Sequence, residues 1–481
     1  MNLCIDSRKV QEGDMFFCID GSALDGHDFA EQAVDNGAKV IIYEHDMPMK
    51  DQEGVIYIKV PSTLDALNEA AASLNGWPSK HLTMFGVTGT NGKSSISYLI
   101  SKIYTKYKGE CGYLGTIGGQ MEGKKYDVRL TTPDIIPLQQ TLEEMRRDGA
   151  EAASIEVSSH GLIQKRVGAV DFDYAIFTNL TREHLDYFKD MENYFQAKSL
   201  FFRNLKPTAV AMVNIDDPYG KRIEELCTGK FMSYAIEQPA DYMAKDIVYS
   251  PEGMSFTLVH EGKEYPVTTN LQVTYNLYNL LAVAGTLNQA GLNLEDVIRE
   301  FEYIPSIPGR MDEIRFGQDY RVIVDYAHTD DSYNKLLHYV RHDLPGIRRI
   351  ITVSGAPGKR DAGNREIFGH YFSQYCDYSI LTEEDCRDES PKKVADEIAA
   401  GMKEGYPHEY IENRAEAIQA AVDMAQPGDI VLYSGNQIVV FFGSNSWSYT
   451  KLGHINDLSA DELTVLLDKD QTVIELQIKS K

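Results

Sequence analysis

Short apolar runs alternate with stretches of helical spacing along most of the chain. Residues 38–44 form an apolar run typical of a buried strand, and residues 63–74 carry apolar side chains at the spacing of one helix face. Residues 75–80, which include Gly76 and Pro78, interrupt this pattern and predict a linker. The first part of the chain is therefore expected to be a small α/β unit.

The same alternation continues through the central part of the chain. Strands are expected at 82–88, 152–157, 175–179 and 209–215, and helices at 93–107, 137–147 and 192–204. This order is typical of βαβ units and a mostly parallel sheet. Residues 230–275 have a more strand-like pattern and are expected to form an accessory sheet, followed by a helix at 276–290.

Two prolines and a glycine within residues 304–310 predict a second boundary. Beyond it, strands are expected at 321–326, 349–354, 378–382 and 430–434, with helices between them, and a last helix at 459–469. The chain is thus predicted to be an α/β protein of three domains. These are an N-terminal domain at 1–79, a central domain at 80–307 with a P-loop-type parallel sheet and an accessory β-sheet, and a Rossmann-like C-terminal domain at 308–481.

The composition narrows the possible functions. The chain has 481 residues and a formal net charge of −25, which argues against broad binding of nucleic acid or of an anionic membrane surface. It contains no long uninterrupted apolar run and no apolar core of signal-peptide length near its start, so no membrane span is expected. The six cysteines are scattered without a C-x-x-C pair, which favours the reducing cytoplasm.

A glycine-rich turn, Gly86-Val-Thr-Gly-Thr-Asn-Gly-Lys-Ser-Ser95, connects an expected strand to an expected helix. Its glycines let backbone N–H groups approach phosphate oxygens, and the helix N-terminus favours anions. Lys93 can bridge the terminal phosphates and the Ser94 hydroxyl can bind Mg²⁺. Val87 stands where the strict Walker pattern has glycine, and the glycines recur at every third residue. We therefore predict a loop that binds nucleotide phosphates.

Polar residues follow two other expected strands. Glu156 ends one of them, and His184 lies shortly after the other. Ligands of open parallel sheets bind at this carboxyl edge, so Glu156 could hold Mg²⁺ directly or through water. Lys198 lies on an expected helix among aromatic residues. From these residues alone a structural role also stays open, and it is the more common one for Glu156 and His184: a capping glutamate, a core histidine and a lysine that extends to the surface.

Several motifs occur in a fixed order. They are the phosphate loop, Leu130-Thr-Thr-Pro-Asp134, Glu156-Val-Ser-Ser-His-Gly-Leu-Ile-Gln-Lys-Arg-Val167, Thr178-Asn-Leu-Thr-Arg-Glu-His-Leu-Asp186, Ala197-Lys198, Asn214-Ile-Asp-Asp217, Pro308-Gly-Arg-Met-Asp312 and Val324-Asp-Tyr-Ala-His-Thr329. In this order the chain resembles the Mur ligase family over nearly its whole length. It is most similar to the members that add the third residue of the peptidoglycan stem peptide, because the block from Glu156 is specific to them, whereas all members share the phosphate loop.

The resemblance implies a role for each matched residue. Lys93, Glu156, His184 and Lys198 would be catalytic. ATP would be bound by Gly89, Thr90, Asn91, Gly92, Lys93, Ser94, Ser95, Asn276, Arg310, Asp325 and His328. Two Mg²⁺ ions would be held by Ser94, Glu156, His184 and Lys198, with Lys198 carbamylated by CO₂. The UDP-MurNAc-dipeptide would contact Ser7, Thr131, Thr132, Ser158, Gln164 and Arg166.

The resemblance also implies the reaction. ATP would phosphorylate the free D-Glu carboxylate of UDP-MurNAc-L-Ala-D-Glu, and an amino-acid amine would attack the acyl phosphate. The expected partners are these small molecules, without nucleic acid, and the expected state is a cytoplasmic monomer. One alternative is a Mur-like amide ligase that acts on a different carboxylate and amino acid. Another is a silent nucleotide-binding scaffold, which would not need the phosphate loop, both carboxyl-edge residues and Lys198 together.

The expected amino-acid site departs from the family pattern. Glu384-Asp-Cys-Arg387 replaces the Asp-Asn-Pro-Arg of diaminopimelate-adding members, and its arginine could pair bidentately with a carboxylate. Gly435-Asn-Gln-Ile-Val439 replaces Gly-Lys-Gly-His-Glu, and Val439 cannot bind an ammonium group. The resemblance assigns the acceptor to Arg360, Glu384, Asp385, Arg387 and Gly435. Diaminopimelate, lysine or another amino acid remain open as the acceptor.

Overall fold

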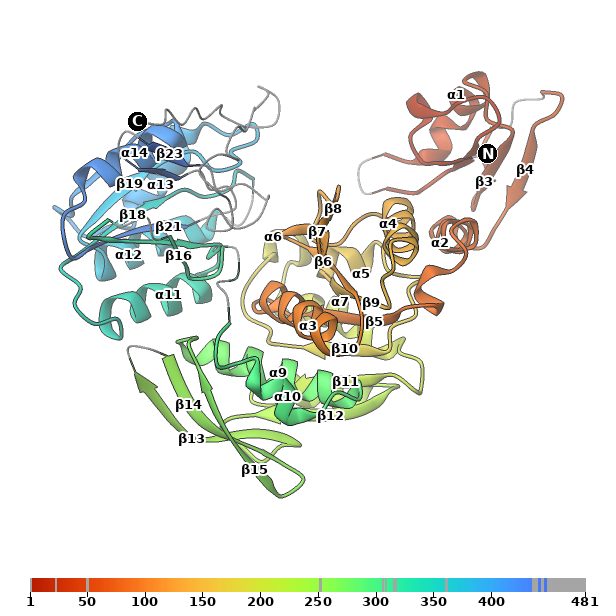
Figure 1. Cartoon of the computed structure of the whole chain (residues 1–481). Helices are drawn as coiled ribbons and strands as arrows, with labels where there is room; N and C mark the ends of the chain where they lie inside the picture. Colours follow the sequence, from red (N-terminus) through yellow and green to blue (C-terminus); the bar gives the residue numbers. More distant parts are fainter. Residues whose placement is uncertain are drawn as a thin grey trace.

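The computed structural model describes residues 2–21, 24–48, 52–250, 253–304, 307, 309–314, 318–359, 362–434, 440–442 and 445–447. Over these residues the chain forms sheets of four, eleven and six strands and one two-stranded hairpin. Figure 1 shows three bodies in an arc, with the central one between the other two. The predicted helix at 459–469 and the predicted acceptor residues Arg360 and Gly435 lie outside the described residues.

The N-terminal sheet is parallel, in the order β1 (Leu3–Cys4), β2 (Met15–Phe17), β3 (Val40–Tyr43) and β4 (Ile56–Lys59). The short helix α1 (Ala30–Asp35) connects β2 to β3, and α2 (Thr63–Leu74) follows β4. The Ser62 side chain caps α2 by accepting the Asp65 N–H at 3.2 Å. Helix α2 also packs against the central domain, and Asp65 of α2 pairs with Lys165 of that domain at 2.7 Å. The predicted strand and helix of this domain are both confirmed.

The central sheet has the order β15-β14-β13-β12-β11-β10-β5-β9-β6-β7-β8. Its strands are β5 (Thr83–Thr88), β6 (Cys111–Gly115), β7 (Gly118–Met121), β8 (Lys124–Tyr126), β9 (Ala152–Glu156), β10 (Tyr174–Phe177), β11 (Val210–Asn214), β12 (Lys230–Ala235), β13 (Tyr242–Ser250), β14 (Gly253–His260) and β15 (Lys263–Thr269). The accessory strands expected after residue 230 are present, and they are hydrogen-bonded to the main sheet as its continuation. Strand β5, which leads into the phosphate loop, lies between β10 and β9.

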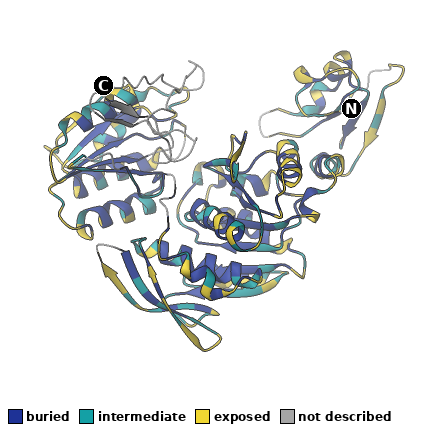
Figure 2. Cartoon of the chain, viewed as in Figure 1, coloured by how far each residue is buried: buried dark blue, intermediate teal, exposed yellow. Residues whose placement is uncertain are grey.

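The side chains of each strand point alternately to the two faces of this sheet, and helices cover both faces. Val87 faces a cluster that includes α3 (Lys93–Tyr107) and α9 (Thr274–Gln289), while Met84 faces a cluster that includes α4 (Ile135–Arg147) and α7 (Met191–Arg203). Figure 2 shows these strands buried between their helices. Smaller helices α5 (Ser159–Ile163), α6 (Leu185–Phe188), α8 (Gly220–Leu226) and α10 (Leu294–Arg299) complete the domain. The predicted long helices are confirmed to within about two residues.

The C-terminal sheet has the order β16-β17-β21-β18-β19-β20 and is parallel except for β16. Its strands are β16 (Asp312–Ile314), β17 (Arg321–Asp325), β18 (Arg349–Ser354), β19 (Tyr378–Leu381), β20 (His408–Tyr410) and β21 (Asp429–Ser434). Helices α11 (Asp330–His342), α12 (Gly363–Tyr375), α13 (Pro391–Ala400) and α14 (Arg414–Met424) connect the parallel strands, which confirms the Rossmann-like prediction. A hairpin of β22 (Val440–Phe442) and β23 (Asn445–Trp447) follows. No helix among the described residues is long and apolar enough to span a membrane.

Candidate active site

The phosphate loop runs from the end of β5 to the start of α3, as predicted. Gly89 and Gly92 have φ angles of 147° and 90°, a region that glycine adopts without the cost of a Cβ. The Lys93 ammonium donates to the main-chain oxygens of Gly89 and Thr90, at 3.0 and 2.7 Å. Burial lowers the pKa of Lys93, and the nearby Glu183 and Glu156 carboxylates oppose this effect. The loop therefore holds its lysine in place with its own carbonyl groups.

Residues after β10 keep the loop in this shape. The Thr178 hydroxyl donates to the Asn91 carbonyl at 2.6 Å, and the Asn179 side chain accepts the Asn91 N–H at 2.9 Å. The Thr90 N–H donates to the Asn179 carbonyl at 2.9 Å. Thr178 and Asn179 were not among the predicted site residues. Their place directly after a strand beside β5 is the signal that could have identified them.

Substitution of Gly89 by alanine is expected to damage both folding and nucleotide binding. A Cβ at Gly89 would lie 1.8 Å from the Thr178 hydroxyl, and the φ angle there is itself unfavourable for alanine. Backbone strain of this kind costs about 1–3 kcal/mol, to which the clash adds. We expect a lower free energy of unfolding in urea and ATP binding weakened at least tenfold in calorimetry.

Gly123→Ala is the matched control for this prediction. Gly123 also has a positive φ of 72°, but a Cβ there would have open space around it. It should lose about 1 kcal/mol and bind ATP normally. Equal behaviour of the two variants would contradict the role of the close approach between Gly89 and Thr178.

Glu156 is completely buried at the end of β9, next to the loop. Its Oε1 accepts hydrogen bonds from the Tyr113 hydroxyl at 2.5 Å and from the Thr116 N–H at 2.9 Å, and its Oε2 accepts from the Thr116 hydroxyl at 3.1 Å. These three donors hold the carboxylate in one orientation. Tyr113 lies on β6 and Thr116 in the turn after it. Both are at least 40 residues from Glu156 in the sequence, so the sequence pattern did not predict them as its partners.

His184 is the N-cap residue of α6 and has a left-handed conformation, with φ 57°. Burial lowers the pKa of its imidazole to about 4, and Glu183, whose Oε1 lies 3.2 Å from His184 Nε2, opposes the shift. The imidazole is therefore neutral near pH 7 and has a lone pair available for a metal. Glu183 was not predicted as a site residue. A carboxylate directly before the histidine was the available signal.

Lys198 lies on α7 and is only 1% exposed. Its ammonium donates at 2.8 Å to the same Gly89 carbonyl that Lys93 contacts, and it lies 4.8 Å from the centre of the Tyr194 ring. Burial and the Lys93 charge hold the pKa of Lys198 well below its usual range, against the effect of Glu183. The lysine is therefore an internal residue of the phosphate loop region. The alternative of a lysine that extends to the surface is therefore wrong for Lys198.

A cavity of about 1110 Å³ opens beside the loop, between the central and C-terminal domains. Asn91, Gly92, Ser95, Asn276, Arg310 and Asp325 line it, together with Asn179, Asn279 and part of α3. The Arg310 guanidinium donates to the Ser94 hydroxyl at 3.0 Å. Asp325 accepts the N–H groups of Met311 and Ala327, both at 2.8 Å, while burial raises its pKa. The structure thus brings most of the predicted nucleotide residues to one cavity.

His328 follows β17 and reaches across to the central domain. Its Nε2 lies 3.1 Å from Glu183 Oε1, and its Nδ1 lies 2.7 Å from the Tyr326 carbonyl oxygen. Burial alone would lower the pKa of His328, but the Glu183 carboxylate raises it above the usual value. Burial alone would likewise raise the pKa of Glu183, but His184 and His328 hold it well below its usual range.

The residues predicted for the muramoyl peptide form a connected group beside Glu156. The Thr132 hydroxyl donates to the Glu156 carbonyl at 2.7 Å, and the Ser158 hydroxyl caps α5 by accepting the Gly161 N–H at 3.1 Å. Arg166 donates to the Thr132 carbonyl at 2.8 Å. Two other predicted residues complete this side: Thr131, 3.1 Å from Thr116 between their hydroxyl oxygens, and the exposed Gln164.

Ser7 belongs to a different domain from this group. It lies in the N-terminal domain, where its buried hydroxyl donates to Gln32 Oε1 at 2.6 Å. It follows β1 at the carboxyl edge of the N-terminal sheet. The structure therefore places Ser7 on another sheet from the rest of the predicted donor-substrate set.

The predicted acceptor residues that are described lie in the loop after β19, at the carboxyl edge of the C-terminal sheet. Glu384 is 2% exposed, and Arg414 Nη1 lies 4.0 Å from its Oε2. Asp385 and Arg387 have left-handed φ angles of 42° and 52°, and their side chains approach each other to 3.7 Å. Arg414 was not predicted, although it is a buried cation at the start of α14. The loop therefore places the Asp385 carboxylate and the Arg387 guanidinium at the carboxyl edge of the C-terminal sheet.

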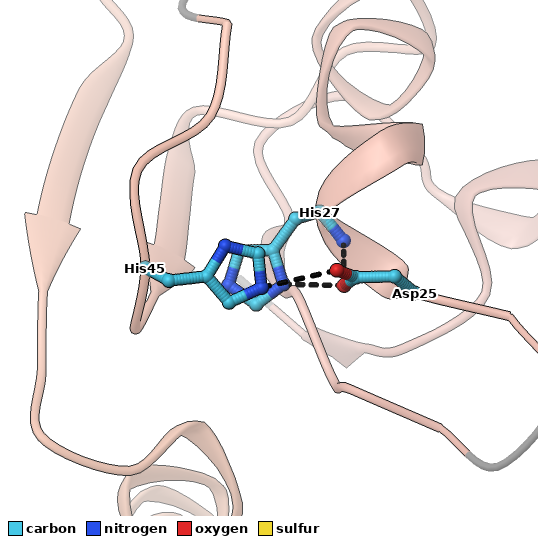
Figure 3. Close-up of side chains that lie close together, drawn as sticks. All are labelled: Asp25, His27 and His45. Atoms are coloured by element: carbon cyan, nitrogen blue, oxygen red, sulfur yellow. Dashed lines mark hydrogen bonds and ion pairs between the residues drawn. The ribbon is translucent and has the colours of Figure 1, made fainter.

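A second cluster of ionisable groups, Asp25, His27 and His45, lies at the carboxyl ends of β2 and β3, and Figure 3 shows both imidazoles beside one carboxylate. Asp25 Oδ1 is 2.6 Å from His27 Nδ1, and Asp25 Oδ2 is 3.0 Å from His45 Nε2. His27 Nε2 accepts the Glu44 N–H at 3.1 Å, so its Nδ1 carries the proton that faces Asp25. Neither nitrogen of His27 then has a free lone pair. The cluster joins two loops and does not fit a metal centre in this arrangement.

The fold and the phosphate loop define a nucleotide-dependent α/β enzyme with an additional domain on either side. Three models of the Mur ligase family match: "Mur ligase family, catalytic domain" over residues 1–74, "Mur ligase middle domain" over 87–287, and "Mur ligase, glutamate ligase domain" over 309–437. The chain belongs to the Mur ligase family and is an ATP-dependent amide ligase. The resemblance seen in the motifs is thereby confirmed.

Curated relatives support the assignment over most of the chain. The UDP-N-acetylmuramoyl-L-alanyl-D-glutamate–2,6-diaminopimelate ligase of Clostridium botulinum is 36% identical over 89% of this chain and 88% of its own length. The enzyme of that name from Alkaliphilus metalliredigens is 35% identical over 96% of this chain and 93% of its own. A solved structure with this name has 29% identity and a TM-score of 0.64, covering 94% of this chain and 93% of its own. MurF from Acinetobacter baumannii, with 22% identity, a TM-score of 0.62 and 90% coverage of each chain, shares the fold.

The comparison changes the interpretation of the last part of the chain. The Mur ligase model ends at residue 437, and a model described as "Cyclophilin-like family" matches residues 403–479. Up to Ser434 the structure continues the Rossmann-like sheet. Val439 lies beyond the Mur match, so its comparison with the family's glutamate does not rest on a matched position.

Proposed function

We propose that the protein attaches an amino acid, with diaminopimelate as the first candidate, to the D-Glu carboxylate of UDP-MurNAc-L-Ala-D-Glu. The observation that carries this proposal is the convergence of the phosphate loop, Glu156, His184 and Lys198 beside the group of Thr132, Ser158 and Arg166. The names of the relatives support the same substrates. The arginine retained at position 387 supports an acceptor with an additional carboxylate.

The chain's own residues can perform each part of this reaction. Lys93, the loop N–H groups and Arg310 would bind the ATP phosphates and offset the charge that spreads over their oxygens during transfer. Thr132 and Ser158 would place the donor near Glu156. Closure of the C-terminal domain over the cavity would exclude water from the acyl phosphate.

The donor atoms present fit Mg²⁺. Glu156 offers a fixed carboxylate, Ser94 a hydroxyl and His184 a neutral imidazole. We propose that these residues, with a carbamate on Lys198, hold two ions. When bound, Mg²⁺ would supply positive charge to the phosphate and acyl oxygens.

Carbamylation fits the surroundings of Lys198. Burial holds the pKa of Lys198 well below its usual range, which favours the neutral amine, and a neutral amine nitrogen can attack the carbon of CO₂ and release one proton. The product carries a negative charge, which the Lys93 ammonium beside the same Gly89 carbonyl would offset. Burial would protect the carbamate from hydrolysis.

We also propose the domain limits and the setting of the enzyme. We place the limits at 1–79, 80–307 and 308–481, which is supported by the turn at Pro78–Lys80 and the segment that precedes β16. We propose a monomer in the cytoplasm, and the six scattered free cysteines support the reducing compartment.

A phosphate-release screen tests the proposed function. The full chain is incubated with ATP, Mg²⁺ and UDP-MurNAc-L-Ala-D-Glu and with one amino acid at a time. We expect meso-diaminopimelate to stimulate release at least tenfold more than L-lysine. Stimulation by another amino acid would reject diaminopimelate as the acceptor but would support UDP-MurNAc-L-Ala-D-Glu as the donor. ATP binding without any release would overturn the donor, and would favour a ligase for another carboxylate or a silent scaffold.

A further inference from the structure

Glu183 links two domains at the phosphate loop. It lies in the loop after β10 of the central sheet, whereas His328 lies in the loop after β17 of the C-terminal sheet. Their Oε1 and Nε2 atoms are 3.1 Å apart, and Glu183 is only 8% exposed. A buried carboxylate is costly unless it is paired, so this contact has a large energetic weight.

The hydrogen-bond geometry assigns a positive charge to His328. Its Nδ1 faces the Tyr326 carbonyl oxygen at 2.7 Å, and its Nε2 faces the Glu183 carboxylate. Both partners are acceptors, so both ring nitrogens must donate, and only the imidazolium does this. The contact is therefore a charge-assisted pair between the two domains.

The same carboxylate also contacts the predicted metal ligand. Glu183 Oε1 lies 3.2 Å from His184 Nε2, and the Tyr194 hydroxyl donates to Oε2 at 3.2 Å. A carboxylate beside Nε2 favours the proton on that nitrogen and leaves the Nδ1 lone pair for a metal. Glu183 thus lies between the C-terminal domain and the imidazole that would bind Mg²⁺.

Two other contacts cross the same boundary at the phosphate loop. Arg310 donates to the Ser94 hydroxyl at 3.0 Å, and the Asn91 side chain donates to Asp331, at the start of α11, at 3.2 Å. Both act on the phosphate loop itself. Of these three contacts, the one made by Glu183 also reaches His184.

We propose that Glu183 is a positioning residue which couples docking of the C-terminal domain, through His328, to the orientation of His184. When the C-terminal domain is docked, the imidazolium neutralises Glu183 and holds its carboxylate against His184. When this contact is broken, Glu183 loses its charged partner and holds His184 less firmly. Docking of the C-terminal domain therefore favours metal binding, and metal binding favours docking. The inference rests on the proposed function for the role of His184 as a Mg²⁺ ligand, and it does not depend on the proposed donor or acceptor substrate.

The test uses Glu183→Gln, which keeps the shape and removes the charge, His328→Asn and the double variant. Calorimetry measures MgADP binding to the full chain at several Mg²⁺ concentrations. Loss of a residue that orients a metal-binding histidine typically costs 10–100-fold in metal affinity. We expect Glu183→Gln to raise the Mg²⁺ concentration for half-maximal binding about tenfold or more. We expect His328→Asn to raise it less, and the double variant to be no worse than Glu183→Gln.

Glu192→Gln is the matched control, because Glu192 is a partly exposed carboxylate of the same domain that pairs with Arg222 at 2.7 Å. It should leave the Mg²⁺ dependence unchanged. A melting curve separates loss of folding from loss of positioning. Unchanged Mg²⁺ dependence in folded Glu183→Gln, or additive effects in the double variant, would overturn the proposal. These outcomes do not involve UDP-MurNAc-dipeptide, so an error in the proposed substrate would not produce them.

Discussion

Replacement of Lys93 by methionine is expected to abolish amino-acid-dependent phosphate release, with kcat reduced at least about 10²–10³-fold. Methionine keeps an unbranched apolar side chain of nearly the same length, but it supplies no charge to the phosphates. The lysine is held beside the loop carbonyls at 2.7–3.0 Å, so its position is set before the nucleotide binds. A steady-state phosphate assay at saturating ATP and Mg²⁺ measures the effect.

Lys125→Met is the control for this experiment. Lys125 is exposed on β8 of the same domain, and its loss should leave kcat within a factor of two. Calorimetry with ATP shows whether the Lys93 variant still binds nucleotide. Wild-type turnover in folded Lys93→Met would mean that the loop does not bind the reacting phosphates.

Replacement of Lys198 by alanine is expected to have a similarly large effect for a different reason. The variant removes the nitrogen that would carry the carbamate and leaves a small buried space beside Gly89. We expect turnover to fall to background and to recover partly with formate or acetate, which can supply a carboxylate to that space. Wild-type protein equilibrated with ¹³C-labelled bicarbonate should show a carbamate signal by NMR that is absent from the variant.

Lys206→Ala provides the comparison, because Lys206 is a half-buried lysine that pairs with Asp173 at 2.7 Å away from the loop. It should keep both turnover and the carbamate signal. Full activity of Lys198→Ala would contradict the metal-site assignment. If Lys198→Ala is inactive but the wild type shows no labelled carbamate, Lys198 is essential as an unmodified amine.

Local patterns predicted the elements of this site well. The alternation of strand and helix located β5, α3 and β9 to within about a residue, because burial on two faces and helical spacing are local properties of the chain. The glycines and lysine of the phosphate loop were also recognisable, since their conformational and chemical roles depend on residue type.

The partners of these residues could not be predicted in the same way. Glu156 depends on Thr116, 40 positions away, and Arg310 reaches Ser94 over 216 positions. Such contacts follow from the order β10-β5-β9-β6 and from the docking of a separate sheet. Neither is encoded in a local pattern, because both result from packing between distant segments.

The amino-acid sequence by itself determined the class of this protein. The order of its motifs, the phosphate loop and the three α/β regions were all present in the residue pattern, because residue type and periodicity carry that information. Only the tertiary structure decided that Lys198 is buried beside Gly89 and that Glu183 pairs with His328. Burial and cross-domain pairing set the charge state of these groups, and these depend on which distant residues pack around them.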